Sequence, residues 1–124
     1  MITQPRSALT DSADLARAIA AIEADRNADD IVMLDIRNLS IVADYFVICS
    51  AETDRQVQAI SRAVLDGLGA QGASPLHVEG LHENPGWVLL DYGDVIAHIF
   101  RTAERDYYRL ERVWGEAPTV LRVQ

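Results

Sequence analysis

The sequence contains no lysine, so its eleven basic residues are all arginine, and they are scattered along the chain. Nineteen aspartate and glutamate residues outnumber them and give a net charge of −8 at pH 7. A surface this acidic repels the phosphate backbone, and no local basic patch offsets the repulsion. The charge therefore argues against direct nucleic-acid readout. It suits a basic protein partner, although a negative surface also serves solubility alone.

Cysteine and long hydrophobic runs are also scarce. Cys49 is the single cysteine, which excludes an internal disulfide and fits a reducing compartment. No apolar run approaches the roughly 18 residues that a membrane span needs. The first twelve residues, MITQPRSALTDS, lack the apolar stretch of a signal peptide. These absences predict a cytoplasmic protein with no membrane partner.

The pattern of the 124 residues predicts one domain of the α/β class, with a single mixed sheet flanked by helices in the order α-β-β-α-β-β-β-α. Residues 1–9 are expected to form a flexible N-terminal arm, 10–114 the domain and 115–124 a C-terminal tail without regular structure. Ile41 and Val42, between the first two strands, are expected to pack against the sheet. The expected helices are 12–25, 53–68 and 103–114, and the expected strands are 31–36, 45–49, 76–79, 87–90 and 95–100.

The most informative stretch is WVLLDYGDVIAHIFR, residues 87–101. Two apolar runs flank Asp91-Tyr92-Gly93-Asp94, and Gly93 can adopt the positive φ of a tight turn. The stretch predicts an antiparallel hairpin with two acidic residues at its tip and Trp87 at its open end. Because side chains alternate along a strand, Ile96, His98 and Phe100 should share one face.

These residues allow an enzymatic interpretation. Asp91 and Asp94 could hold a magnesium ion, as in a metal-dependent nucleotidyltransferase. Such an enzyme also needs a loop that cradles phosphates, but the glycine-rich stretch 67–72 follows a helix and carries no cation. The simpler alternative is that both aspartates are turn formers bonded to their own backbone and that His98 is a half-buried strand residue.

Two further chemical patterns are weak. The string from His77 to His82 spaces its histidines around a strand and a loop, so they would not converge as zinc ligands on one helical face. Cys49 lies in an apolar run where burial raises a thiol pKa, which disfavours a nucleophilic pair with His98. The residues therefore predict no catalytic, metal or cofactor site.

A binding interpretation uses the same hairpin. Tryptophan and tyrosine dominate the energetic centres of protein interfaces, and here Trp87 and Tyr92 stand among acidic residues. Such a surface fits a basic protein partner, with electrostatic complementarity orienting the approach. The acidic residues around it are Glu79, Glu83, Asp91 and Asp94.

Several segments together resemble the ribosomal silencing factor family, also called RsfS or Iojap. They are Asp35, ADYFVIC (43–49), VEG (78–80), WVLLDYGDVIAH (87–98) and YYRLERVW (107–114), in the family's order. The arm before Leu9 and the tail after Trp114 lie outside this pattern, and Pro85-Gly86 alters the loop before Trp87.

This resemblance implies a nucleotidyltransferase-like shape without that enzyme's activity. It implies binding to the large ribosomal subunit through that subunit's ribosomal protein fourteen, which blocks joining of the small subunit and represses translation. Independently of the resemblance, homodimers are common, so a further alternative is that the hairpin face pairs with its own copy in the free state. By position, Trp87, Leu90, Asp91 and Tyr92 would face the ribosomal protein. Asp44, Arg55, Gly93, Asp94 and His98 also match the family, without individual roles.

Overall fold

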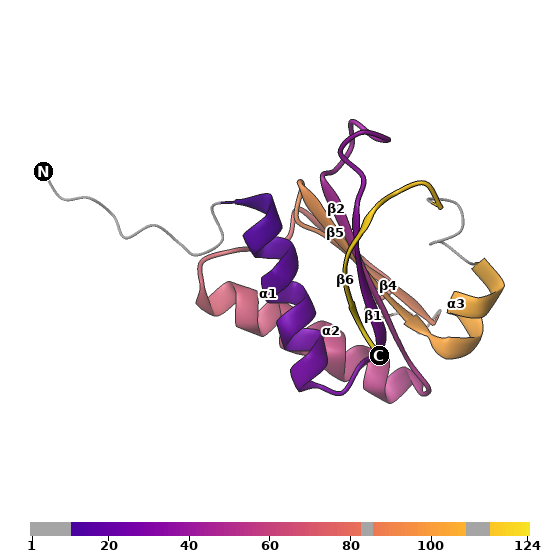
Figure 1. Cartoon of the computed structure of the whole chain (residues 1–124). Coiled ribbons are helices and arrows are strands. Elements are labelled where there is room, and N and C mark those ends of the chain that lie inside the picture. The colour runs from indigo at the N-terminus through magenta and orange to yellow at the C-terminus, as the bar shows by residue number, and fades with distance from the viewer. Residues whose placement is uncertain (1–10, 83–85, 109–114) are drawn as a thin grey trace, which may run out of the picture.

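The structure, a computed structural model, describes residues 11–82, 86–108 and 115–124 (Figure 1). One mixed sheet is flanked by helices, which confirms the expected fold class. The elements are α1 (Ser12–Asp25), β1 (Asp29–Asp35), β2 (Tyr45–Ala51), α2 (Asp54–Ala70), β3 (His77–Glu79), β4 (Trp87–Asp91), β5 (Val95–Arg101), α3 (Thr102–Tyr108) and β6 (Thr119–Val123).

The strands of the described chain follow the order β3-β4-β5-β2-β1-β6. Among these pairs, β2 and β5 are parallel and the other neighbours are antiparallel. The parallel pair lies in the middle of the sheet and joins the β1–β2 hairpin to the β3–β4–β5 meander. The β1–β2 connection, the β4–β5 turn and the start of β3 consequently lie at the same end of the sheet, which we call the loop end.

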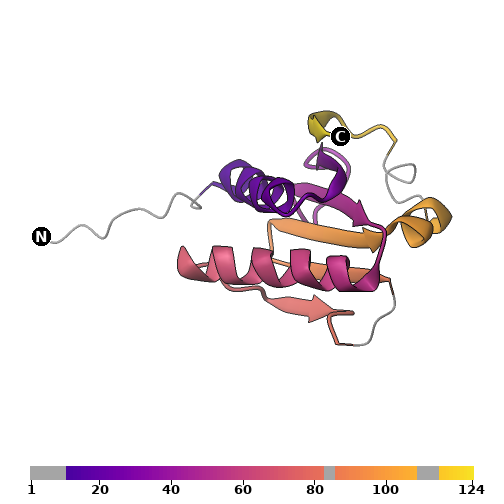
Figure 2. The same cartoon turned by 90° about the horizontal axis from the view of Figure 1, so that it is seen from below.

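The two faces of the sheet are covered differently. Helices α1 and α2 cover one face, over a core that includes Ile31, Val47 and Leu90 (Figures 1 and 2). The short helix α3 lies on the other side of the sheet, where Phe46 and Phe100 belong to a second apolar cluster. Strand alternation produces this division, since neighbours along β2 and β5 enter opposite clusters.

Both long helices begin where capping residues predict. Asp11 accepts a hydrogen bond from the Ala13 amide at 3.2 Å. The Thr53 hydroxyl accepts one from the Gln56 amide at 3.1 Å, and these bonds satisfy amides that lack a partner within the helix. The expected helix 53–68 corresponds to α2, and its buried residues Val57, Ile60, Val64 and Leu68 follow helical spacing along one face.

The expected unstructured tail is wrong, because residues 119–123 form β6 and pair antiparallel with β1. β6 pairs with the edge of β1 that β2 leaves free, where unpaired backbone groups would otherwise face solvent. The expected packing of Ile41 and Val42 against the sheet is also wrong, since both side chains are exposed. The expected arm 1–9 and the expected helical continuation 109–114 lie outside the described residues.

Helix α3 is fixed to the sheet by Arg105, whose side chain is buried. Its Nη1 donates to the Asp30 carbonyl at 2.6 Å and to the Ser50 hydroxyl at 3.1 Å. Asp30 has a φ of +48° and lies where the β1–β2 register shifts, so the arginine stabilises an irregular point of β1.

Across the described residues, no helix is both long and apolar enough for a bilayer crossing.

Candidate functional site

The expected hairpin is present in the structure. Strands β4 and β5 pair antiparallel, with Trp87 opposite Phe100 and Asp91 opposite Ile96. Gly93 in the connecting turn has a φ of +90°, which an L side chain rarely adopts. Residues 92–94 therefore form a tight connection that places the two aspartates at the loop end of the sheet.

Backbone bonding holds both aspartates in place. The Asp91 side chain accepts a hydrogen bond from the Gly93 amide at 2.7 Å, which confirms it as a turn former. Asp94 contributes through its backbone carbonyl, which accepts from the amides of Asp44 at 2.7 Å and Tyr45 at 3.2 Å. These bonds tie the hairpin tip to the start of β2 and assign a structural role to the backbone of Asp44.

Potential metal ligands do not gather in the described part of the chain. Those residues contain no group of three or more histidine, cysteine, aspartate or glutamate side chains placed to hold an ion. His77 Nε2 and Glu79 Oε1 lie 3.5 Å apart on β3, and both side chains are exposed. Asp91 and Asp94 therefore belong to no group of three potential ligands within the described residues.

Cys49 and His98 belong to different faces of the sheet. Cys49 packs beneath α1, whereas His98 projects from the α3 side among aromatic rings. In the parallel pairing His98 lies opposite Ile48, and Cys49 lies opposite Ile99, so alternation separates the two side chains. Burial raises the Cys49 thiol pKa well above its usual value, consistent with the expected inert thiol.

The centre of the α3-side face is an aromatic cluster around His98. The Trp87 indole donates a hydrogen bond from Nε1 to His98 Nδ1 at 3.1 Å. The Trp87 ring lies 4.7 Å from that of Phe100, and the Phe46 ring meets His98 edge-on at 4.8 Å. His98 is buried, so these contacts fix the position of the half-buried Trp87 ring.

The Trp87 hydrogen bond requires a neutral His98 with its proton on Nε2. Burial lowers the His98 pKa to about 4 from 6.5, because the charged ring would lose its hydration. Within the described residues, Nε2 has no hydrogen-bond partner. The histidine is therefore an uncharged acceptor at neutral pH and not a proton carrier.

We expect His98 to make the fold sensitive to acid. The unfolded chain binds a proton near pH 6.5 and the folded chain near pH 4, so the contribution is intact above pH 6.5 and is lost as pH falls towards 4. The stability advantage of wild type over His98→Leu should shrink by about 3 kcal/mol between pH 7 and pH 4. Urea unfolding at four pH values measures this difference. A constant difference would contradict the assignment.

The expected partner-binding residues do not form one patch. Trp87 is half-buried on the α3 side at the start of β4, whereas Asp91 lies at the loop end of that strand. Tyr92 packs against the core beneath α1 and α2, and burial raises its pKa to about 12. Leu90 is fully buried in the same core.

The expectation that Leu90 contacts the partner is wrong, because its side chain is fully buried. Trp87, Leu89 and Asp91 alternate on one face of β4, so Val88 and Leu90 point into the opposite core. Of the family positions without a role, Arg55 is exposed in the first turn of α2. Ile41 and Val42 of the β1–β2 connection, expected to pack against the sheet, are instead exposed at its loop end.

Comparison with known proteins gives a consistent result. A family model described as "Ribosomal silencing factor during starvation" matches residues 9–124. The ribosomal silencing factor RsfS of Bacillus subtilis is 48% identical over 94 residues, which cover 76% of this chain and 79% of the relative. RsfS of Halalkalibacterium halodurans is 42% identical over 103 residues, covering 83% of this chain and 86% of that protein.

A solved structure agrees with these sequence matches. The crystal structure of a protein from Chromobacterium violaceum superimposes with a TM-score of 0.82 at 29% identity, covering 86% of this chain and 88% of that one. The family match runs to residue 124, so the segment after Trp114, expected outside the family pattern, lies within it. This extension agrees with the presence of β6 in the sheet. The chain belongs to the ribosomal silencing factor (RsfS) family.

Proposed function

We propose that this protein represses translation in the cytoplasm without catalysing a reaction. It binds the large ribosomal subunit through ribosomal protein fourteen and sterically blocks joining of the small subunit. The observation that carries this proposal is family membership, since the match to the silencing-factor model spans residues 9–124. This mechanism requires no cofactor, because a protein bound to the large subunit is sufficient to keep the small subunit from joining at that surface.

Charge and geometry support a protein partner. A net charge of −8 with no lysine favours a basic surface, and ribosomal proteins that contact RNA carry such surfaces. The Asp91 carboxylate accepts a hydrogen bond from the Gly93 amide, which holds this partly exposed acidic group at the loop end. The interface we propose is extended and not a single compact patch: it runs along β4 from Trp87 to Asp91 and ends at the partly exposed Tyr92 in the turn.

Replacing Trp87 by glutamate should weaken co-sedimentation with purified large subunits at least about thirtyfold, because an interface tryptophan can contribute more than 2 kcal/mol. The same variant should no longer reduce the joined-ribosome fraction when small subunits are added. Binding constants from the sedimentation series and sucrose-gradient profiles of the mixtures provide the two readouts.

Two variants separate binding from folding. Trp87→Phe keeps a ring against Phe100 but removes the bond to His98, so it should bind within a few fold of wild type. Val123→Glu places the same new charge on an exposed valine of β6, at the end of the sheet away from the loop end, and should bind normally. If Trp87→Glu retains the wild-type circular dichroism spectrum and binds like wild type, the interface has been misplaced.

A further inference from the structure

The connection between β1 and β2 exposes an unusual amount of aliphatic surface. Ile41 is fully exposed, Val42 is 73% exposed and Leu39 is 41% exposed. Leu76, at the start of β3, is 76% exposed at the same end of the sheet. Contiguous exposed apolar side chains on a small domain mark an interaction site more often than isolated ones do.

The connection is held in a defined shape. The Ile36 carbonyl accepts from the amides of Leu39 at 3.0 Å and Ser40 at 2.9 Å. The Ser40 hydroxyl accepts from the Val42 amide at 3.0 Å, and the Ile36 amide donates to the Asp44 carbonyl at 2.9 Å. Because these bonds already order the backbone, docking the aliphatic side chains costs less conformational entropy than ordering a free loop would.

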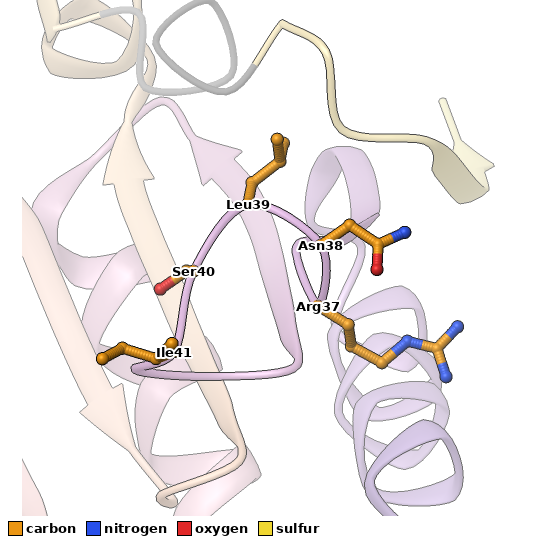
Figure 3. A pocket seen from close by; sticks show the side chains of 5 residues that line it. All are labelled: Arg37, Asn38, Leu39, Ser40 and Ile41. Atoms are coloured by element: carbon orange, nitrogen blue, oxygen red, sulfur yellow. The ribbon is translucent and has the colours of Figure 1, made fainter.

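The side chains of the connection project in different directions from this frame. Figure 3 shows Leu39 and Ile41 projecting away from Arg37, with Ser40 between them. Residues 37–41 line a shallow pocket of about 480 Å³ that is open to solvent. Leu39 and Ile41 belong to the lining of this hollow, and we call the exposed aliphatic side chains of Leu39, Ile41 and Val42 the ridge.

The surroundings of this ridge are acidic. Asp44 and Asp94 are joined through their backbones at 2.7 Å, and Asp91 lies in the adjacent turn. The cation of the connection, Arg37, is already paired, since its Nη2 lies 2.7 Å from Asp35 Oδ2 and its guanidinium lies over the Tyr45 ring. The exposed charge around the aliphatic groups is consequently negative.

We propose that the β1–β2 connection, residues 37–42, is a second contact element that seats Ile41 and Val42 in an apolar hollow of a basic protein surface on the large ribosomal subunit. The inference rests on the proposed function and adds the part of the surface that docks. Charge favours this occupant over a second copy of the chain. A two-fold contact through the loop end would bring the aspartates of both copies together.

The test compares the double variant Ile41→Glu/Val42→Glu with wild type in a sedimentation titration against purified large subunits. Binding should weaken at least about tenfold, because two anchoring groups are replaced by charges that their hollow cannot solvate. Ile41→Ser/Val42→Ser adds no charge and should lose a smaller part of the affinity. Val123→Glu is the matched control and should bind like wild type.

The outcomes separate this inference from the proposed function. If wild type fails to sediment with large subunits, both are overturned. If wild type binds and the folded double variant binds equally well, the contact element alone is overturned. Light scattering supplies the other decisive result, because a double variant that loses self-association but keeps subunit binding would assign the ridge to a second copy.

Discussion

Replacing Arg105 by alanine is expected to lower the free energy of unfolding by about 3 kcal/mol, measured by urea denaturation. The buried guanidinium donates to the carbonyl oxygen of Asp30 and to the hydroxyl of Ser50. Removing it leaves the partly buried Asp30 carbonyl and the buried Ser50 hydroxyl without this donor and breaks the contact between α3 and β1. It also releases Asp30 from the contact that helps to hold its positive φ.

Two comparisons make this prediction specific. Arg122 also pairs with Asp30, at 3.1 Å, but both side chains are exposed, so Arg122→Ala should cost less than about 1 kcal/mol. Arg105→Lys should recover little stability, because an ammonium lacks the planar fork that reaches several acceptors. Equal losses for Arg105→Ala and Arg122→Ala would mean that burial does not set the strength of these contacts.

The second large effect concerns Glu23, a fully buried glutamate of α1. Burial raises its pKa from 4.5 to about 8, although the neighbouring Cys49 thiol and the charge of Arg105 oppose the rise. The folded chain therefore keeps a proton that the unfolded chain releases above pH 4.5. The stabilising contribution is complete below pH 4.5 and disappears as pH rises towards 8.

Glu23→Gln should remove this dependence, because an amide is isosteric and does not ionise. Wild type should lose roughly 3 to 4 kcal/mol relative to the variant between pH 5 and pH 8, the reverse of the His98 effect. Urea unfolding across this range measures the change. Glu52→Gln, at an exposed position, is the matched control. Parallel pH profiles for wild type and Glu23→Gln would contradict the assignment.

Local sequence signals predicted the hairpin and its faces correctly. A turn of Asp91, Tyr92 and Gly93 between two apolar runs leaves few alternatives, and strand alternation places Ile96, His98 and Phe100 together. The same alternation would have placed Leu90 in the core. Grouping it with Trp87 by nearness in the sequence produced the error, because a strand sends neighbouring side chains to opposite faces.

Other features depend on contacts that no local pattern contains. Strand β6 is short and mostly exposed, and it becomes a strand because β1 offers an unpaired edge. The burial of Arg105 depends on an irregularity in β1, which lies 75 residues earlier in the chain. Ile41 and Val42 carry an apolar signal that is interpreted as packing against the sheet, but apolar character alone does not decide whether a loop residue is buried.

The strand order has a consequence for how the chain assembles. The β1–β2 hairpin comes from the first half of the chain, and both of its edges are paired with strands from the second half, β5 on one side and β6 on the other. The β1–β2 hairpin therefore lies between β5 and β6 in the sheet. Both of these pairings join strands that are distant in the sequence. Such pairings close large loops, which makes their formation slow compared with that of the local hairpins. Separating the two halves of the chain would break the β2–β5 and β1–β6 pairings together. We therefore expect the halves to unfold as one cooperative unit.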